Sequence, residues 1–263
     1  MKGNKHIERD GQNATKIFDS RSLAKDYRNL VQILEPGITV LDIGCGTGSI
    51  SKDIANYIGK EGKVVGIDNT ENTINSGKES YQSVSSLELI AVDLFDFNPE
   101  IKFDLIISAR TLQWLSNPKA ALIKMKSLLK PNGQISILDY DHTNLIWNPL
   151  PPQSMQEFYK TFLKWRADAG MNNKIAEDLP QLLKETGFHS IEKINSDEVY
   201  TNTDSDFKSK IAIWSKVAGS KQMVEEGYLE ETLRLKAIEE YNNWIENSAL
   251  SMTMKLNEVR GKL

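Results

Sequence analysis

Cysteine and histidine are both scarce in this chain of 263 residues. A single thiol, Cys45, excludes an intramolecular disulfide and a multi-cysteine metal site. The three histidines, His6, His142 and His189, lie too far apart in the sequence to show the spacing of zinc ligands. We therefore expect neither a disulfide scaffold nor a metal centre.

Long apolar runs and basic clusters are missing too. No segment approaches the roughly 18 to 20 consecutive apolar residues that span a bilayer, and the polar start of the chain is unlike a signal peptide. The formal net charge is −4, and no run of lysine and arginine could neutralise several phosphates together. The sequence favours a cytoplasmic protein without membrane insertion or a nucleic-acid partner. It does not exclude a local groove lined by basic residues.

The chain does have enough apolar sequence, 40% of its residues, for one sizeable α/β core. Apolar segments of strand length alternate with amphipathic segments of helix length, which predicts βαβ units and a parallel sheet. The predicted strands cover residues 39–43, 63–68, 87–92, 103–108, 134–139, 190–199 and 251–259. Predicted helices between them cover residues 49–58 and 120–129.

Helical additions to this pattern are also expected. Residues 148–152 (NPLPP) break the chain after the fifth strand, and residues 155–165 are rich in aromatic side chains. We interpret the chain as one domain, 1–263, with an N-terminal helical segment over residues 1–35 and helical insertions over residues 145–185 and 206–247. We expect the two insertions to form a lid; the competing interpretation is that they complete the core.

The most informative motif is Asp42-Ile43-Gly44-Cys45-Gly46-Thr47-Gly48, where an apolar strand leads into alternating glycines and then a helix. Glycine permits positive φ and leaves space for a ligand, and a helix start offers N–H groups to an anion. An ordinary turn or a dinucleotide site is the alternative, but the dinucleotide fingerprint needs glycine where this chain has Ser49. A carboxylate at Asp42 would repel a pyrophosphate and attract a cationic amino group.

Acidic residues follow the next two strands as well. Asp68 ends the second strand, where a carboxylate can accept both hydroxyls of a ribose. After the third strand, Asp93 can accept a hydrogen bond from an exocyclic adenine amine while Leu94 covers the ring face. Taken singly, each acid also fits a solvated residue at a strand end.

These motifs together, in order and spacing, resemble the cofactor motifs of class I S-adenosylmethionine-dependent methyltransferases over about residues 36–140. The resemblance implies a Rossmann-like three-layer α/β sandwich, a seven-stranded mostly parallel sheet with an antiparallel last strand, and S-adenosyl-L-methionine as cofactor. It implies cofactor contacts from Asp42, Gly44, Cys45, Gly46, Gly48, Asp68, Asn69, Asp93, Leu94, Ser108, Ala109 and Arg110. Through SARTLQWLSNP, residues 108–118, the chain resembles small-molecule enzymes of the ubiquinone/menaquinone-biosynthesis and trans-aconitate type.

A sulfonium donor carries an activated methyl group, so the protein mainly has to align an acceptor for in-line displacement. Alignment alone can contribute on the order of 7 to 11 kcal/mol, and a base is needed only if the acceptor loses a proton. His142 and Tyr140 are the candidate catalytic residues, with Asp139 and Asp141 beside them at the expected end of the fifth strand. For His142, a solvated loop histidine is the alternative.

Acceptor contacts are expected from Trp147, Tyr159 and Arg166, because aromatic rings and an arginine suit an acidic or aromatic acceptor. A packing helix with an exposed arginine is the alternative for Arg166. None of the candidate cofactor or acceptor residues identifies the acceptor, the atom that is methylated or the oligomeric state. A homodimer therefore stays open.

Methyl transfer to a small-molecule acceptor is therefore the function we expect, and three others compete with it. Ser49 disfavours a nicotinamide-dependent oxidoreductase. The acidic balance, and the lack of an Asn-Pro-Pro-aromatic tetrad after the fourth strand, disfavour a nucleic-acid methyltransferase. A non-catalytic cofactor-binding or interaction protein stays open, because in-line methyl transfer need leave no catalytic signature in a sequence.

Overall fold

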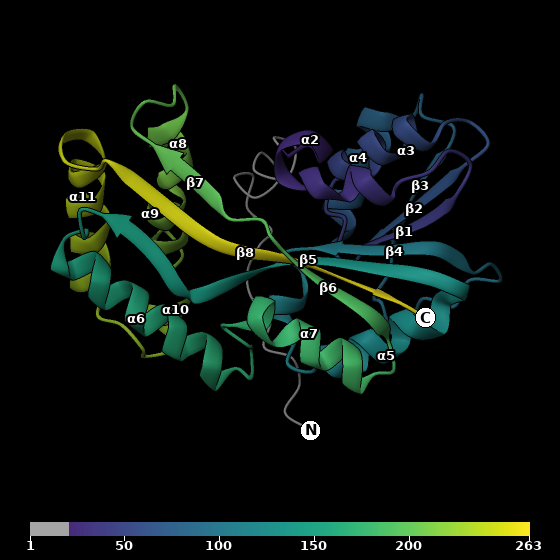
Figure 1. Ribbon diagram of the computed structural model, residues 1–263. Helices are drawn as coiled ribbons and strands as arrows, with labels where there is room; N and C mark the ends of the chain where they lie inside the picture. The colour runs from purple at the N-terminus through teal and green to yellow at the C-terminus, as the bar shows by residue number, and fades with distance from the viewer. Residues whose placement is uncertain (1–20) are drawn as a thin grey trace. The chain divides into compact units, whose positions relative to one another are not determined.

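The computed structural model describes residues 21–263, which divide into two compact units (Figure 1). The larger unit comprises residues 21–139, Ile175–Ser196 and Asn257–Leu263. The smaller unit comprises Tyr140–Lys174 and Asp197–Leu256. The expected N-terminal helical segment, 1–35, lies partly outside the described residues, and His6 lies wholly outside them. Each unit is described by itself below.

The strands follow the order β3-β2-β1-β4-β5-β8-β6, and β7 pairs with β8. Neighbouring strands from β3 to β5 are parallel, whereas β6 and β7 both run antiparallel to β8. This is the expected mostly parallel sheet with antiparallel final pairing. The bounds are β1 Thr39–Ile43, β2 Lys63–Asp68, β3 Leu87–Ala91, β4 Phe103–Ala109, β5 Leu129–Asn148, β6 His189–Asn195, β7 Glu198–Thr201 and β8 Ser251–Lys262.

Two strand expectations need correction. The single strand predicted over residues 190–199 is split between β6 and β7, so the described residues contain eight strands rather than seven. Within the smaller unit, the Asp197 carboxylate accepts the backbone N–H of Leu256 (3.1 Å) and the ammonium of Lys255 (2.5 Å). A side chain there takes the hydrogen bond that a strand neighbour would otherwise take, which ends the ladder.

Strand β5 is also far longer than the predicted 134–139, since it runs to Asn148. Its far end is held by the backbone N–H of Leu250, which donates to the carbonyl of Asn148 (2.8 Å). Tyr140, Asp141 and His142 therefore lie inside a strand, and the expectation that they follow the end of one is wrong. Local apolar alternation could not reveal this, because the extension depends on pairing with a distant segment.

The helices of the larger unit begin where the local sequence supplies a start signal. Helix α3 follows Gly48 directly and buries Ile50, Ile54 and Ile58 on one face, as predicted. In α5 the side chain of Asn117 accepts the N–H of Ala120 (3.0 Å), so this helix starts before the predicted residue 120. The bounds are α2 Leu23–Asp26, η1 Arg28–Ile33, α3 Ser49–Ile58, α4 Glu71–Tyr81, η2 Leu112–Trp114, α5 Pro118–Leu128 and α7 Ile175–Glu185.

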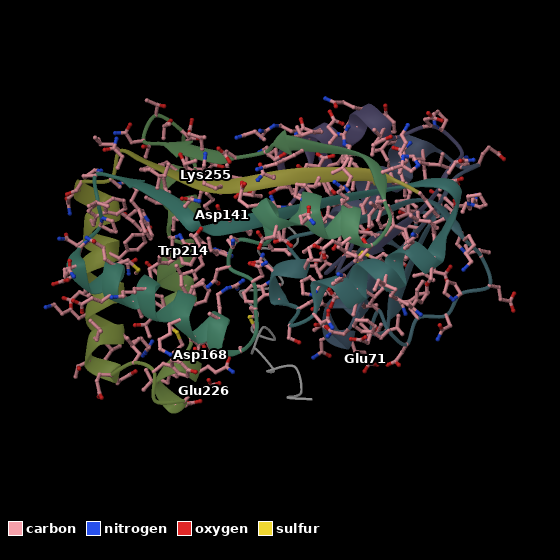
Figure 2. The ribbon with its side chains drawn as sticks, turned by 60° about the horizontal axis from the view of Figure 1, so that its bottom comes forward. Glu71, Asp141, Asp168, Trp214, Glu226 and Lys255 are labelled. Atoms are coloured by element: carbon pink, nitrogen blue, oxygen red, sulfur yellow. The ribbon has the colours of Figure 1, made fainter. Side chains whose placement is uncertain are left out.

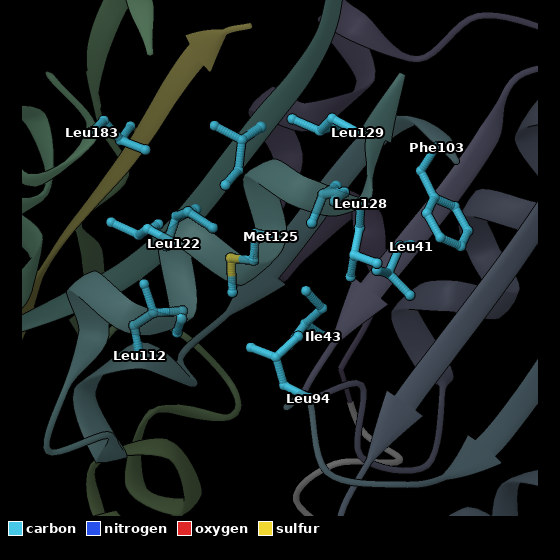
Figure 3. Packing of buried hydrophobic residues seen from close by; sticks show 14 of the residues in the cluster. Leu41, Ile43, Leu94, Phe103, Leu112, Leu122, Met125, Leu128, Leu129 and Leu183 are labelled. Atoms are coloured by element: carbon cyan, nitrogen blue, oxygen red, sulfur yellow. The ribbon is translucent and has the colours of Figure 1, made fainter. Parts of the chain in front are cut away.

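Apolar side chains from the sheet and from α5 form the core of the larger unit (Figure 3). Leu41 and Ile43 of β1 lie in one buried cluster with Leu122 and Met125 of α5. Burying a side chain of this size contributes about 1.5 to 3 kcal/mol. The core thus fixes β1 and β4 side by side and holds the loops that follow them in place.

Helices and the strand ends make up the smaller unit. Helices α6 and α11 lie beside each other (Figure 1), and the hydroxyl of Ser154 donates to Glu240 (2.6 Å) between them. Phe158, Phe162 and Trp165 of α6 are buried in this unit, while lid function for the insertions stays a prediction. The helices are α6 Gln153–Asp168, α8 Phe207–Ile211, α9 Ile213–Ala218, α10 Gln222–Glu225 and α11 Glu231–Asn247.

The helical insertion predicted over residues 206–247 consists of four separate helices, α8 to α11. Glycines at 219 and 227 follow α9 and α10, and Gly227 has φ +75°, which ends a right-handed helix. Among residues 21–263, no helix combines the length and the apolar character needed to cross a membrane.

Candidate active site

The glycine turn, residues 44–48, joins β1 to α3 and is fixed by its neighbours. The backbone N–H groups of Gly44 and Cys45 donate to the carbonyl of Ile67 in β2 (2.8 and 3.1 Å). Gly44 has φ +72°, and a Cβ there would lie 2.2 Å from the Thr111 hydroxyl after β4. The turn therefore packs between the ends of β2 and β4 with no room for a side chain at position 44.

Asp68 at the end of β2 is the acid that the turn orients. One carboxylate oxygen accepts the N–H of Gly46 (3.1 Å), and the other accepts the N–H of Thr70 (2.9 Å). Each oxygen keeps acceptor capacity beyond these bonds. The structure thus brings together two separate sequence motifs and fixes the orientation of the Asp68 carboxylate beside the glycine turn. Asn69, the next candidate, is exposed beside it.

Asp42 lies beneath the turn rather than on its surface. Its side chain is buried, and the hydroxyl of Ser51 donates to it (2.6 Å). Burial raises the pKa of this carboxyl to about 7, and the negative charge of Asp68 contributes to the rise. A cationic group bound nearby would favour the charged carboxylate, which fits the expected role of Asp42 toward an ammonium.

Beyond β3, the two candidates Asp93 and Leu94 differ in exposure. Asp93 is exposed and accepts the N–H of Phe95 (2.8 Å), which fixes the carboxylate at the start of the loop. Leu94 instead belongs to the buried core with Ile43 (Figure 3). Asp93 is therefore the member of the pair with polar atoms available to a ligand.

At the end of β4, two of the three candidate side chains have protein partners. Ser108 is fully buried, and its hydroxyl donates to the carbonyl of Ile43 (2.8 Å). Arg110 has φ +60°, and its guanidinium donates to the carbonyl of Asp26 (3.2 Å). Ala109 between them is partly exposed, and its carbonyl accepts the hydroxyl of Thr111 (3.2 Å).

Gly77 of α4 is a residue whose importance the sequence did not reveal. A Cβ at this position would lie 2.1 Å from the backbone carbonyl oxygen of Thr47, inside the glycine turn. The helix can approach the turn this closely only because residue 77 has no side chain. A helical glycine carries no sequence signal of such a contact, because the partner is thirty residues away.

Replacing Gly77 by alanine is expected to destabilise the protein by about 1 to 3 kcal/mol, because the backbone must move to relieve the contact. In a helix without that contact, the same change stabilises by about 1 kcal/mol, so the sign is diagnostic. Urea unfolding measures this change in the free energy of unfolding, and Asn75→Ala on the exposed face of α4 is the matched control. A more stable Gly77→Ala variant would contradict the close approach.

The acceptor candidates all lie in the smaller unit, and three of them, His142, Trp147 and Tyr159, pack against Trp214 of α9, which is labelled in Figure 2. We define the aromatic cluster as Tyr140, His142, Trp147, Tyr159, Phe162 and Trp214. The ring of Trp214 lies 4.7 Å from Tyr159, 5.7 Å from Phe162, 6.1 Å from His142 and 6.4 Å from Trp147, between centroids. In the sequence, Trp214 is one apolar residue of the predicted helical insertion 206–247, a pattern that indicates packing only, so its central position could not be predicted.

His142 and Arg166 are both buried, so the alternatives of a solvated loop histidine and an exposed arginine are wrong. Burial holds the pKa of His142 well below its usual range, and the charge of Arg166 lowers it further. The imidazole is therefore neutral at pH 7. The guanidinium of Arg166 lies 5.4 Å over the Phe162 ring and donates to Asn173 (2.8 Å).

The remaining candidates around the fifth strand have assigned partners. The hydroxyl of Tyr140 donates to Glu198 (3.3 Å), and the hydroxyl of Tyr159 donates to the backbone carbonyl of His142 (2.6 Å). Asp139, in the larger unit, is fully buried and accepts the N–H of Gln113 (3.1 Å). Within the described part of the chain, no three His, Cys, Asp or Glu side chains are placed to hold a metal ion.

A parallel sheet with a glycine turn after β1 and an acid after β2 defines a Rossmann-like α/β domain of the kind that binds nucleosides. The family described as "Methyltransferase domain" matches residues 34–243. This chain therefore belongs to that methyltransferase family.

Curated relatives share the same region. The chain is 28% identical over 203 residues to a demethylmenaquinone methyltransferase of Listeria monocytogenes, covering 71% of this chain and 84% of the relative. It is 30% identical over 136 residues to the malonyl-[acyl-carrier protein] O-methyltransferase 2 of Ilyobacter polytropus, covering 50% and 52%. The chain thus spans about half the length, 52%, of this second relative, and the same share of a putative methyltransferase of Invertebrate iridescent virus 6.

Solved structures show the same fold at low identity. The phosphoethanolamine N-methyltransferase 2 of Haemonchus contortus matches 99% of this chain and 54% of its own, at 18% identity with a TM-score of 0.56. A methyltransferase from Aquifex aeolicus matches 74% of this chain and 93% of its own, at 21% identity with a TM-score of 0.54. These likenesses support the Rossmann-like fold.

Proposed function

We propose that this chain transfers a methyl group from S-adenosyl-L-methionine to a small-molecule acceptor by in-line displacement. The observation that carries the proposal is Asp68, whose carboxylate is fixed by the N–H of Gly46 beside the glycine turn. A ribose diol is the ligand group that this geometry fits. Membership of the methyltransferase family, and relatives named as methyltransferases, support the same function.

The larger unit supplies the residues that would hold the cofactor. Asp68 would accept the ribose hydroxyls, and Asp93 would accept from the adenine amine. The glycine turn would admit the nucleoside against its backbone, and Asp42 would stabilise the ammonium group from below. The cofactor, when bound, supplies a methyl group already activated by the sulfonium charge.

The smaller unit supplies the residues that would hold the acceptor. The aromatic cluster offers apolar ring faces, and Arg166 places a positive charge beside them. Neutral His142 keeps a lone pair that could take a proton from an acceptor, and its lowered pKa suits an acceptor that loses the proton readily. The similar proteins are named as methyltransferases of demethylmenaquinone, malonyl-[acyl-carrier protein] and phosphoethanolamine, so their names leave the acceptor of this chain open.

Calorimetry tests the cofactor directly. We expect S-adenosylhomocysteine to bind with a Kd near the micromolar range, about −8 kcal/mol, and NADH not to bind. The matching control is adenosine, which can occupy the Asp68 and Asp93 positions but lacks the amino-acid part. Tight NADH binding without binding of the sulfur compound would refute the proposal.

A non-catalytic cofactor-binding protein is the main competitor. Incubation with labelled donor and a metabolite extract separates the two, because an enzyme forms acceptor-dependent demethylated donor and a binding protein does not.

We further propose a cytoplasmic protein that acts without nucleic acid, in keeping with the net charge of −4. A homodimer stays a prediction.

A further inference from the structure

In an open parallel sheet, ligands bind where the strand order reverses, outside the carboxyl ends of two neighbouring strands. Here that point lies between β1 and β4, because β1 continues toward β2 and β3 on one side while β4 continues toward β5 on the other. The loops that follow β1 and β4 are the glycine turn and the segment starting at Arg110. Whatever bridges these two loops controls access to the point of reversal.

Residues 21–33, which we call the strap, make that bridge. At the start of α3, the hydroxyl of Ser49 donates to the carbonyl of Arg21 (2.5 Å), and the N–H of Leu23 donates to Asp53 (3.0 Å). Across the reversal point, Arg110 donates to the carbonyl of Asp26 (3.2 Å). The outer half of the strap, residues 21–26, is thus hydrogen-bonded to α3, which follows the glycine turn directly, and to the segment that follows β4. Ser49 is also the residue that replaces the last glycine of the dinucleotide fingerprint.

The inner half of the strap, residues 27–33, is held in a different way. Tyr27 is buried and its hydroxyl donates to the carbonyl of Ser136 in β5 (2.8 Å). Arg260 of β8 donates to the carbonyl of Asn29 (2.6 Å) and is itself paired with the buried carboxylate of Glu258 (2.6 Å). This half is anchored in the core, where opening costs far more than at a half-exposed segment.

A joint separates the two halves. Tyr27 has φ −145° and ψ 41°, which interrupts the helical backbone between α2 and η1. Helix α2 keeps its own end caps, since Ser22 accepts the N–H of Lys25 (3.3 Å) and Asp26 accepts the N–H of Ser22 (2.9 Å). The outer half can therefore move about Tyr27 when Leu23 leaves its buried position and the hydrogen bonds to Ser49, Asp53 and Arg110 break.

We propose that the outer half of the strap, residues 21–26, lies over the cofactor position and is hinged at Tyr27, and that its opening sets the rate of cofactor release. The inference rests on the proposed function, because it assigns a ligand to the loops that the strap bridges. Asp53 is then a positioning residue: it holds the strap through Leu23 and touches neither cofactor nor acceptor.

Stopped-flow release of S-adenosylhomocysteine from the full chain tests the proposal. In Asp53→Ala the acceptor for the Leu23 N–H is lost, and we expect the release rate to rise about tenfold with the unfolding midpoint in urea unchanged. Asp53→Asn keeps an acceptor oxygen and should stay near the wild-type rate. Lys52→Ala removes the ion pair that Lys52 makes with Asp53 (2.6 Å) but leaves the strap tie, so it too should resemble wild type.

Hydrogen exchange adds a readout that a purely structural role would not move. We expect the amides of residues 21–26 to exchange faster than those of residues 27–33 in the free protein, and to become protected with S-adenosylhomocysteine bound. An unchanged release rate in Asp53→Ala, with normal binding, would overturn the strap alone. Failure of the wild-type protein to bind S-adenosylhomocysteine would overturn both the strap and the proposed function.

Discussion

Replacing Asp68 by alanine is expected to weaken S-adenosylhomocysteine binding by two orders of magnitude or more. Two charge-assisted hydrogen bonds to the ribose are lost, each worth about 1.5 to 3 kcal/mol, and about 1.4 kcal/mol is a tenfold change in affinity. The same change releases the N–H of Gly46, so the glycine turn also loses the contact that orients it. Calorimetry gives the dissociation constant of each variant.

Two further variants make this measurement specific. Asp68→Asn keeps one acceptor oxygen but loses the charge, so its affinity should fall between wild type and Asp68→Ala. Glu88→Ala removes an exposed acid of β3 that pairs with Lys63 (2.7 Å), and it should bind like wild type. An Asp68→Ala variant with an unchanged dissociation constant would show that Asp68 is not the ribose ligand.

The boundaries of β1 and α3 could be predicted from the sequence to the exact residue, because every signal in this region is local. The apolar run ends in glycines, the helix follows at once, and Ile50, Ile54 and Ile58 already lie on one helical face. The break between β6 and β7 was not predictable in this way. It depends on the Asp197 carboxylate meeting the N–H of Leu256, fifty-nine residues later.

The candidate site shows the same division between local and distant causes. Asp42, Gly46 and Asp68 could be named from the sequence because motif and spacing carry them, and the bond between Gly46 and Asp68 then joins the motifs in space. The place of Trp214 could not be named, since its neighbours come from β5 and α6. Burial of Arg166 depends on the same packing, and a helix pattern does not distinguish a buried arginine from an exposed one.

Asp42 should make the stability of the protein fall as the pH rises, and Asp42→Asn should remove that fall. The fold raises the pKa of this carboxyl from an ordinary value of 3.8 to about 7, chiefly through burial. The stabilising neutral form is thus fully present below about pH 4, and its advantage is lost as the pH rises through about 7. Because a difference of one in pKa between the folded and unfolded states corresponds to about 1.4 kcal/mol, the total loss of stability is on the order of 4 kcal/mol.

Urea unfolding of Asp42→Asn and wild type at a series of pH values between 4 and 8 isolates this effect. Asparagine can still accept the Ser51 hydroxyl, and the cost of burying its amide group is the same at every pH, so only the change in the difference matters. We expect the free energy of unfolding of Asp42→Asn to increase relative to that of wild type as the pH rises. Asp104→Asn is the matched control: although partial burial acts against it, hydrogen bonds from Lys130 and Thr39 lower the pKa of Asp104, so the stability that this carboxylate contributes changes only below about pH 4, and the difference between this variant and wild type should stay nearly constant from pH 4 to 8. A difference between Asp42→Asn and wild type that stays constant from pH 4 to 8 would show that the fold leaves the pKa of Asp42 at its ordinary value, and at neutral pH an ammonium group would then find a full negative charge already in place beneath the turn.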